Sequence, residues 1–462
     1  MSLPPLVAPS VAVARRAPGS PILWVLAFVG AHVLLGVICS QFRVVATLHG
    51  VATVAVAFGL ALLSKRVDRV LAIAGYCALC DVFWRMTKSA MPWEGAKYLA
   101  GAILLIAFFR FVSRPKRISV PIAFLVLLVP SCITAIVVLG PAEARGQISA
   151  NIAGPALLVI SVMMFRQVIA SESDVGRFLW VLLGPITAVA AVSTTSTLTA
   201  GAIDFGTESN FTTSGGFGPN QVSVMLGLGA LICLVLALAR ASASLLVVQI
   251  GMGVWFVAQA ALTFSRGGLY SLGIAVVAMI VVGLATSGLR SRVLVGVLIG
   301  VVVLAAAYPT LNAFTSGSLE ERFVDTNITD REAIAGADFE LFTRSPLFGV
   351  GVGVSKYERA STSFDVEETK AHTEFTRLLG EHGVLGLTAL VLLGSMAVSA
   401  VRSASTRWNR LIAAAFVAWP LLTMLHNATG VAAVAFIFGF SQVRLRRDDD
   451  LGGAAPPLPA GW

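Results

Sequence analysis

Long apolar stretches separated by short polar connections run along most of the chain. Because a helix needs roughly 20 apolar residues to cross a bilayer, we interpret each stretch as a membrane-spanning helix. His426 and Asn427 interrupt the last stretches, so the pattern predicts about 12–14 transmembrane helices. The predicted spans are 21–40, 44–63, 70–84, 97–112, 119–139, 151–170, 178–199, 220–239, 244–264, 269–287, 293–308, 384–401, 410–425 and 428–443.

The composition leads to the same class of protein. Of the 462 residues, 57% are hydrophobic and 12% are charged, whereas a soluble protein carries about a quarter charged residues. These values exclude a soluble domain, a disordered chain and a small disulfide-stapled module. The predicted fold class is all-α: a polytopic helical membrane protein.

Basic residues recur in every second connection between the predicted spans. Such connections lie on the cytoplasmic side of a membrane, so we expect both termini to be cytoplasmic. The net charge of +9 is explained by this topology, and we expect no nucleic-acid partner. The basic residues concerned are Lys65, Arg66, Arg69, Arg114, Lys116, Arg117, Arg177, Arg240, Arg290, Arg292, Arg402, Arg407, Arg410, Arg444, Arg446 and Arg447.

One extracytoplasmic connection, residues 309–376, is far longer than the others and holds 12 of the 24 acidic residues. Ile334, Phe339 and Leu341 recur in it at helical intervals, which predicts short helices on the membrane surface. The predicted division is therefore 1–308 for the first eleven transmembrane helices, 309–376 for the extracytoplasmic loop, 377–447 for the C-terminal transmembrane helices and 448–462 for a cytoplasmic tail.

Two arginines on the extracytoplasmic side are candidate anion ligands, because charges at a membrane edge are costly. Arg266 lies in Thr-Phe-Ser-Arg-Gly-Gly, where glycines allow close backbone approach and a guanidinium can bind phosphate through two hydrogen bonds. The alternative is a snorkelling arginine. Arg331 starts a predicted surface helix, where it either faces a membrane-edge cavity or joins a solvated cluster with Asp330 and Glu332.

His372 precedes the twelfth predicted span. A neutral histidine is a suitable general base near pH 7, and the alternative interpretation is a surface histidine. Glu374, Glu381 and His382 are nearby polar alternatives.

Further polar residues lie at the same predicted ends of the spans. Asn220 and Gln221 stand at the entry of the eighth span, where they cap the helix or bind a sugar hydroxyl. Asp81, Arg85 and Lys88 follow at helical spacing and form either an internal salt-bridge ladder or an extension of an anion site. The acidic residues of the long loop are dispersed, so we predict no metal site and no cofactor.

The order of the motifs resembles the O-antigen ligase and O-antigen polymerase superfamily of bacterial envelope membrane proteins. The motifs are Gly-Pro-Asn-Gln at a span entry, Ser-Arg-Gly-Gly at a span end, an isolated arginine in a long loop, Ser-Pro-Leu-Phe-Gly-Val-Gly-Val-Gly, and His-x10-Gly-x-x-Gly before a span. The similarity covers roughly residues 200–400, and the first 200 residues match only in hydropathy.

The resemblance implies a metal-independent glycosyltransferase with a GT-C-like fold in the bacterial cytoplasmic (inner) membrane. Such enzymes pass a glycan from an undecaprenyl-diphosphate carrier to a hydroxyl of a glycan or glycolipid acceptor. Arg266 and Arg331, with Ser265 beside the first, would bind the diphosphate. His372 would orient or deprotonate the acceptor hydroxyl, and Thr373 stands where the family often has Asn, Ser or Gln.

Two other classes stay open at this point. A transporter or flippase of lipid-linked glycans would keep its charges near the bilayer midplane, whereas the candidate charges here cluster at the edge. A peptidoglycan glycosyltransferase of the shape-and-division family would use a loop carboxylate, for which Asp325, Asp330 and Asp365 are available. Because fourteen spans exceed the twelve common in ligases, ligase and polymerase are both open.

Overall fold

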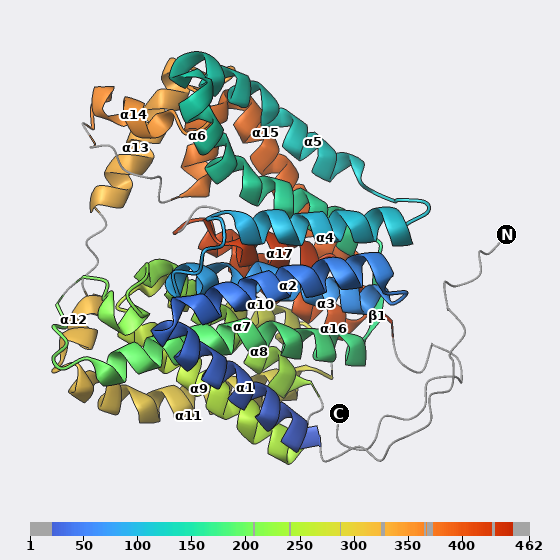
Figure 1. Cartoon of the computed structure of the whole chain (residues 1–462), viewed down its shortest axis with the longest axis vertical. Helices are drawn as coiled ribbons and strands as arrows, with labels where there is room; N and C mark the ends of the chain where they lie inside the picture. Colours follow the sequence, from blue (N-terminus) through green and yellow to red (C-terminus); the bar gives the residue numbers. More distant parts are fainter. Residues whose placement is uncertain are drawn as a thin grey trace.

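The computed structural model describes residues 21–206, 208–239, 242–286, 288–324, 329–364, 366, 373–426 and 430–446. For residues 21, 303, 304, 323 and 329–331 within these ranges, it describes the backbone and not the side chain. The described chain is almost entirely helical (Figure 1). Its elements are α1 (Pro21–Gln41), α2 (Arg43–Leu63), α3 (Val67–Met86), α4 (Gly95–Phe111), α5 (Ser119–Leu127), α6 (Val129–Phe165), β1 (Ile169–Ser171), α7 (Glu172–Thr199), η1 (Thr212–Ser214), α8 (Pro219–Leu238), α9 (Ala243–Leu262), α10 (Arg266–Leu284), α11 (Arg290–Phe314), α12 (Ser318–Val324), α13 (Thr329–Arg344), α14 (Ser355–Glu358), η2 (Arg359–Ser361), α15 (Glu374–Arg402), α16 (Arg407–Thr423), α17 (Ala432–Phe440) and β2 (Arg444–Arg446).

The protein is an all-α, polytopic membrane protein, as the apolar pattern predicts. In the described residues, nine helical stretches are long and apolar enough to cross a membrane. One of them, 119–165, contains two predicted spans, because α6 bends at Gly140, whose φ of 77° is not helical. Shorter or more polar helices, α3, α4 and α16, cover three further predicted spans.

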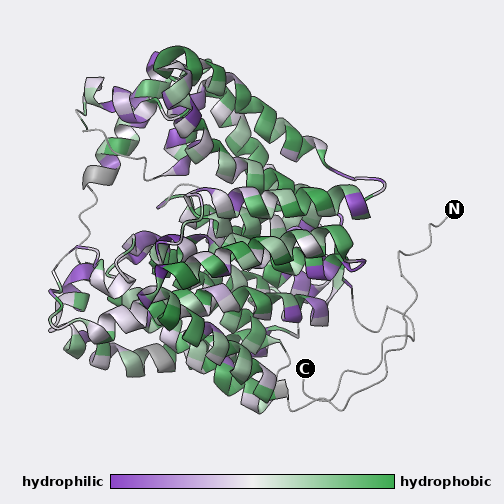
Figure 2. Cartoon of the chain, viewed as in Figure 1, coloured by the Kyte–Doolittle hydropathy of each residue, from purple (hydrophilic) through white to green (hydrophobic). Residues whose placement is uncertain are grey.

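The long helices run side by side, and short elements gather at their two ends (Figure 1). We call the end that carries α12, α13 and α14 the loop end. The opposite end, where β1 pairs in parallel with β2 through Ile169 and Arg444, is called the strand end. Hydrophobic residues fill the middle of the bundle and hydrophilic ones concentrate toward both ends (Figure 2), as a bilayer between two aqueous phases requires.

The last predicted span, 428–443, is wrong as a full membrane-crossing helix. In its described part, residues 430–443, the α-helix α17 has nine residues, which is about 14 Å at 1.5 Å per residue. All nine are buried. A short helix with an irregular approach is tolerated at membrane depth because protein, and not lipid, surrounds it.

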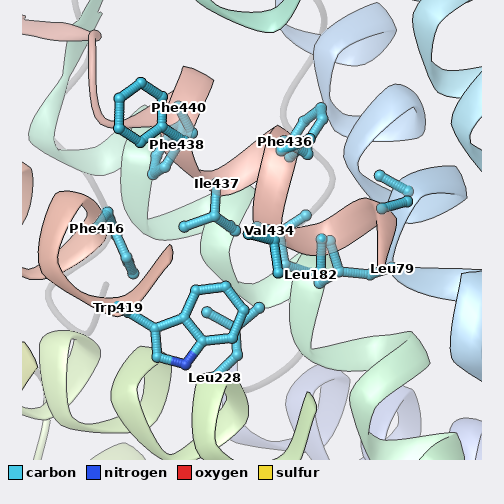
Figure 3. Packing of buried hydrophobic residues seen from close by; sticks show 14 of the residues in the cluster. Leu79, Leu182, Leu228, Phe416, Trp419, Val434, Phe436, Ile437, Phe438 and Phe440 are labelled. Carbon is cyan, nitrogen blue, oxygen red and sulfur yellow. The ribbon is translucent and has the colours of Figure 1, made fainter. Parts of the chain in front are cut away.

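The core of the protein forms around α17 (Figure 3). Phe436 contacts the ring of Phe165 from α6 edge-on at 5.3 Å between centroids, and Phe440 stacks on Phe178 from α7 at 4.7 Å. Trp419 of α16 is fully buried in the same cluster. Because lipid is as apolar as these side chains, their close packing holds α17 in place.

Candidate functional site at the loop end

The connection between α16 and α17, residues 424–431, is where several distant segments meet. The backbone N–H of Glu374, at the start of α15, donates to the carbonyl of Met424 at 2.8 Å. The Nδ2 of Asn220, at the start of α8, donates to the carbonyl of His426 at 2.9 Å. Residues 427–429 lie outside the described residues. The Gly-Pro-Asn-Gln motif and the start of α15 are therefore held by two neighbouring parts of one connection.

The α16–α17 connection is also held by α3. Arg85 donates from Nη1 to the carbonyl of Gly430 at 3.1 Å. The carboxylate of Asp81 accepts from the N–H of Ala432 at 2.8 Å, and so caps the first turn of α17.

The Ser-Arg-Gly-Gly segment joins the same place through α8. Ser265 donates from Oγ to Oδ1 of Asn220 at 2.9 Å, and Ser223 donates to the carbonyl of Ser265 at 2.9 Å. A Cβ added at Gly268 would lie 2.1 Å from the carbonyl oxygen of Ser223. Only glycine permits this approach of α10 to α8, so the second glycine of the motif is needed for packing.

Arg266 is the first residue of α10 and is half-buried at this junction. Phe264, two residues earlier, has a φ of 55°, which turns the chain from α9 into α10. A second guanidinium reaches the segment from α12, since Arg322 donates from Nε to the carbonyl of Phe264 at 3.0 Å. The sequence motifs do not point to Arg322, because nothing in its local pattern distinguishes it from the other charges of the loop.

His372 lies outside the described residues, and Arg331 is described only as backbone in α13. Thr373, the neighbour of His372, is the N-cap of α15, where its Oγ1 accepts from the N–H of Phe375 at 3.2 Å. The next residue, Glu374, is bonded to Met424. The roles assigned to His372 and Arg331 stay predictions.

Gln221 has an unused acceptor at the start of α8. Its Oε1 is buried and has no hydrogen-bond partner within the described residues. The neighbouring Asn220 uses both side-chain atoms to bond Ser265 and His426. We predicted that both residues bind substrate. The side chain of Asn220 is used to link α8 to the segments of Ser265 and His426, whereas Oε1 of Gln221 is an unused hydrogen-bond acceptor among the described residues.

Arg85 belongs to a buried group of four charges. It pairs with Asp81 at 2.9 Å and Glu94 at 3.6 Å, and Lys97 pairs with Glu94 at 2.6 Å. Its guanidinium also lies 4.6 Å from the ring centroid of Trp93. Two positive and two negative charges balance one another, which favours the internal-ladder interpretation for Arg85.

Lys88 is not part of that group. It is exposed, has a φ of 53°, and makes no ion pair in the described part of the chain. Its assignment to substrate binding stays a prediction.

A second buried charge cluster links the long loop to α15. Asp338 of α13 pairs with Arg359 at 2.8 Å, and both side chains are fully buried. Arg377 of α15 pairs with Glu374 and Glu381, each at 2.5 Å. Burial raises the pKa of Asp338, although Arg359 opposes that shift.

Ser355 joins the two halves of this cluster. It accepts from Arg359 at 3.2 Å and donates to Glu381 at 2.9 Å. The sequence indicates Glu374 and Glu381 as polar alternatives, whereas Arg377 between them is not among the predicted site residues. Its spacing, three residues after Glu374 and four before Glu381, was the available signal.

The glycine-rich turn after α13 joins this cluster to α6. The N–H groups of Val350 and Gly351 donate to the carbonyls of Gly380 and Glu381 at 3.0 and 3.1 Å, and Val352 donates to Ser131 at 3.1 Å. These donors are used inside the protein, so they do not cradle phosphate. The turn is therefore close-packed against α15 and α6.

The fold and this set of contacts define a multi-pass helical membrane protein with a polar centre at one end of its helices. Residues 253–391 match the model of a protein family described as O-antigen ligase. The matched segment covers less than a third of the chain and runs from α9 into α15. It includes Ser-Arg-Gly-Gly, the long loop and the start of α15, so the resemblance to the O-antigen ligase and O-antigen polymerase superfamily is confirmed. No curated protein matches the chain.

Proposed function

We propose that this protein transfers a glycan from an undecaprenyl-diphosphate carrier to an acceptor hydroxyl, as a ligase or polymerase, at the loop end of the membrane. One observation supports this proposal above the others. The segments that carry Asn220, Ser265 and Glu374, far apart in sequence, meet around residues 424–426. A glycan-transfer activity of this general type also agrees with the O-antigen ligase match.

The donor diphosphate would lie against Arg266, with Arg331 and Arg322 as further cations. A lipid-linked diphosphate keeps its charge at the headgroup plane and its tail in the bilayer, so its enzyme needs cations at a membrane edge. Arg266 begins a membrane helix and Arg322 binds the turn before it. Guanidinium groups stabilise the charge that develops on a departing diphosphate, and no metal ion is needed in this scheme.

The acceptor hydroxyl would lie against His372 and Thr373. In the reaction, the acceptor oxygen forms a bond to the anomeric carbon, and the bond from that carbon to the diphosphate oxygen breaks. The diphosphate leaves with the electron pair and His372 takes the hydroxyl proton. A single displacement of this kind inverts the anomeric configuration.

The distribution of basic residues supports one orientation in the membrane. Lys65, Arg69, Arg117 and Arg444 lie at the strand end, which supports a cytoplasmic strand end and an extracytoplasmic loop end in a bacterial inner membrane. The lipid-linked donor and the acceptor would then meet on the outer side, and both chain termini would be cytoplasmic.

A transporter is the second candidate function, because α17 is a short helix that begins inside the bundle. Transporters bind anionic substrates at the N-termini of such broken helices. Here the N–H of Ala432 at that end is already bonded to Asp81. This carboxylate favours glycan transfer at the membrane edge over substrate binding at α17.

Reconstituted glycan transfer tests the proposal. Proteoliposomes containing the wild type or Arg266→Ala, Arg331→Ala or His372→Ala would receive an undecaprenyl-diphosphate glycan and acceptor without added metal. We expect transfer by the wild type and a fall of about 100-fold or more in each variant. Arg290→Ala, at the strand end, is the matched control and should keep full activity. Unchanged transfer in all three variants would refute the assignment.

A further inference from the structure

An open groove runs along the last turns of α2 into the α2–α3 connection at the strand end. Its volume is about 570 Å³, which is within the usual range for small-molecule sites. The part of the groove along α2 is apolar, and the part at the α2–α3 connection is basic. The residues that line the groove are Val56, Gly59, Leu60, Leu63, Ser64, Lys65, Arg66 and Arg69.

The hollow of the groove comes from Gly59. A Cβ added there would meet no atom within 4 Å. Val56, one turn earlier, is 52% exposed, so the apolar wall continues into the lipid-facing surface of α2. Arg110 of α4 donates to the carbonyls of Ala61 and Ser64, which fixes the end of α2 and hence the shape of the groove.

The basic end of the groove has surplus positive charge. Arg66 pairs with Asp68 at 2.6 Å. Lys65 and Arg69 make no ion pair among the described residues, and both are exposed. The four cations Lys65, Arg66, Arg69 and Arg110 outnumber the two carboxylates, Asp68 and Asp174, whose charges act on Arg66 at this end.

We propose that this groove binds an anionic phospholipid of the leaflet at the strand end. Its phosphate would lie between Lys65 and Arg69, and one acyl chain would lie over Gly59 along Val56 and Leu60. Basic pockets between membrane helices suit such headgroups. A soluble anion would contact the basic end alone. A phospholipid has a charged headgroup for the basic end and an acyl chain for the apolar residues.

Native mass spectrometry of the full-length protein tests this directly, with phosphatidylglycerol as the probe and phosphatidylcholine as the neutral comparison. We expect the wild type to retain phosphatidylglycerol selectively. Lys65→Glu with Arg69→Glu should weaken that retention by about tenfold or more, since each basic residue near the surface contributes. Gly59→Leu should also weaken it, because the new side chain occupies the hollow, where an added Cβ meets no protein atom within 4 Å.

Two controls separate this site from general effects. Arg290→Glu with Arg292→Glu reverses another exposed basic pair of the strand end, and Gly30→Leu fills an equally open position on α1. Both should retain phosphatidylglycerol as the wild type does. Equal losses in the controls, or full retention in the groove variants, would overturn the proposal. Displacement of the lipid by inorganic phosphate, with no effect of Gly59→Leu, would overturn it in favour of a free-anion site.

Discussion

At the scale of single residues, the ion pair between Asp338 and Arg359 is the feature that tolerates substitution least. Both side chains are fully buried, and removal of one partner leaves an uncompensated charge. Its place between α13 and η2 ties the long loop to α15 through Ser355. We infer that the pair keeps the loop folded against the bundle.

Replacing Arg359 tests this inference. We expect Arg359→Met to lower the free energy of unfolding by about 3–5 kcal/mol, because Asp338 is left buried and unpaired. Arg344→Met is the matched control from the same helix as Asp338, since its pair with Glu340 is partly exposed and should contribute less than about 1 kcal/mol. Thermal unfolding in detergent measures both, and equal losses would contradict the account.

The pH dependence of stability tests the environment of Asp338. Because burial raises the pKa of Asp338, the folded protein binds a proton there more tightly than the unfolded chain does. The contribution that proton binding at Asp338 makes to the free energy of unfolding is fully present below the pKa of an unfolded aspartate, about 3.9. That contribution is lost as the pH rises through the raised pKa of the folded state. The Tm of Asp338→Asn should therefore fall less with rising pH than that of the wild type. Identical pH profiles would show that Asp338 does not titrate abnormally.

At the scale of elements, the contact between α8 and α10 positions Arg266. Gly268 has no room for a Cβ because the backbone of Ser223 lies in its place. Gly273, further along α10, has open space around it. The two glycines of one helix therefore offer a direct comparison.

Alanine substitution at these glycines should have opposite effects. We expect Gly268→Ala to destabilise the protein by about 1–3 kcal/mol through overpacking and to reduce glycan transfer, since α10 must shift. Gly273→Ala should be neutral or stabilise by about 0.5–1 kcal/mol, as in other helix interiors. Unfolding midpoints and transfer rates of the two variants check this, and equal behaviour would mean that close packing does not position Arg266.

Hydropathy alone predicted the helices well, because each crossing must be apolar and its backbone must bond internally. It failed at α17, where the apolar run 428–443 contains a helix of only nine residues. Length and composition cannot distinguish a lipid-facing span from a short helix enclosed by Phe165, Phe178 and Trp419.

At the scale of the whole molecule, the candidate site depends on contacts that sequence spacing does not carry. The motifs placed Asn220, Ser265 and Arg266 at helix ends, and the structure links the first two by a hydrogen bond. The α16–α17 connection accepts hydrogen bonds from Glu374 and Asn220, and no spacing in the sequence indicates these contacts. The interruption at His426 was the sequence signal for that connection.

The convergence of the α10 and α15 starts is the central claim, and cross-linking measures it most directly. With the five native cysteines replaced, Arg266→Cys and His372→Cys would be paired and treated with a short bis-thiol reagent. The account predicts rapid cross-linking that bound undecaprenyl diphosphate slows. The control pair, Arg266→Cys with Arg292→Cys, spans the length of α10, about 28 Å, and should not react. If the first pair reacts no faster than the control, or the lipid diphosphate has no effect, the account is contradicted.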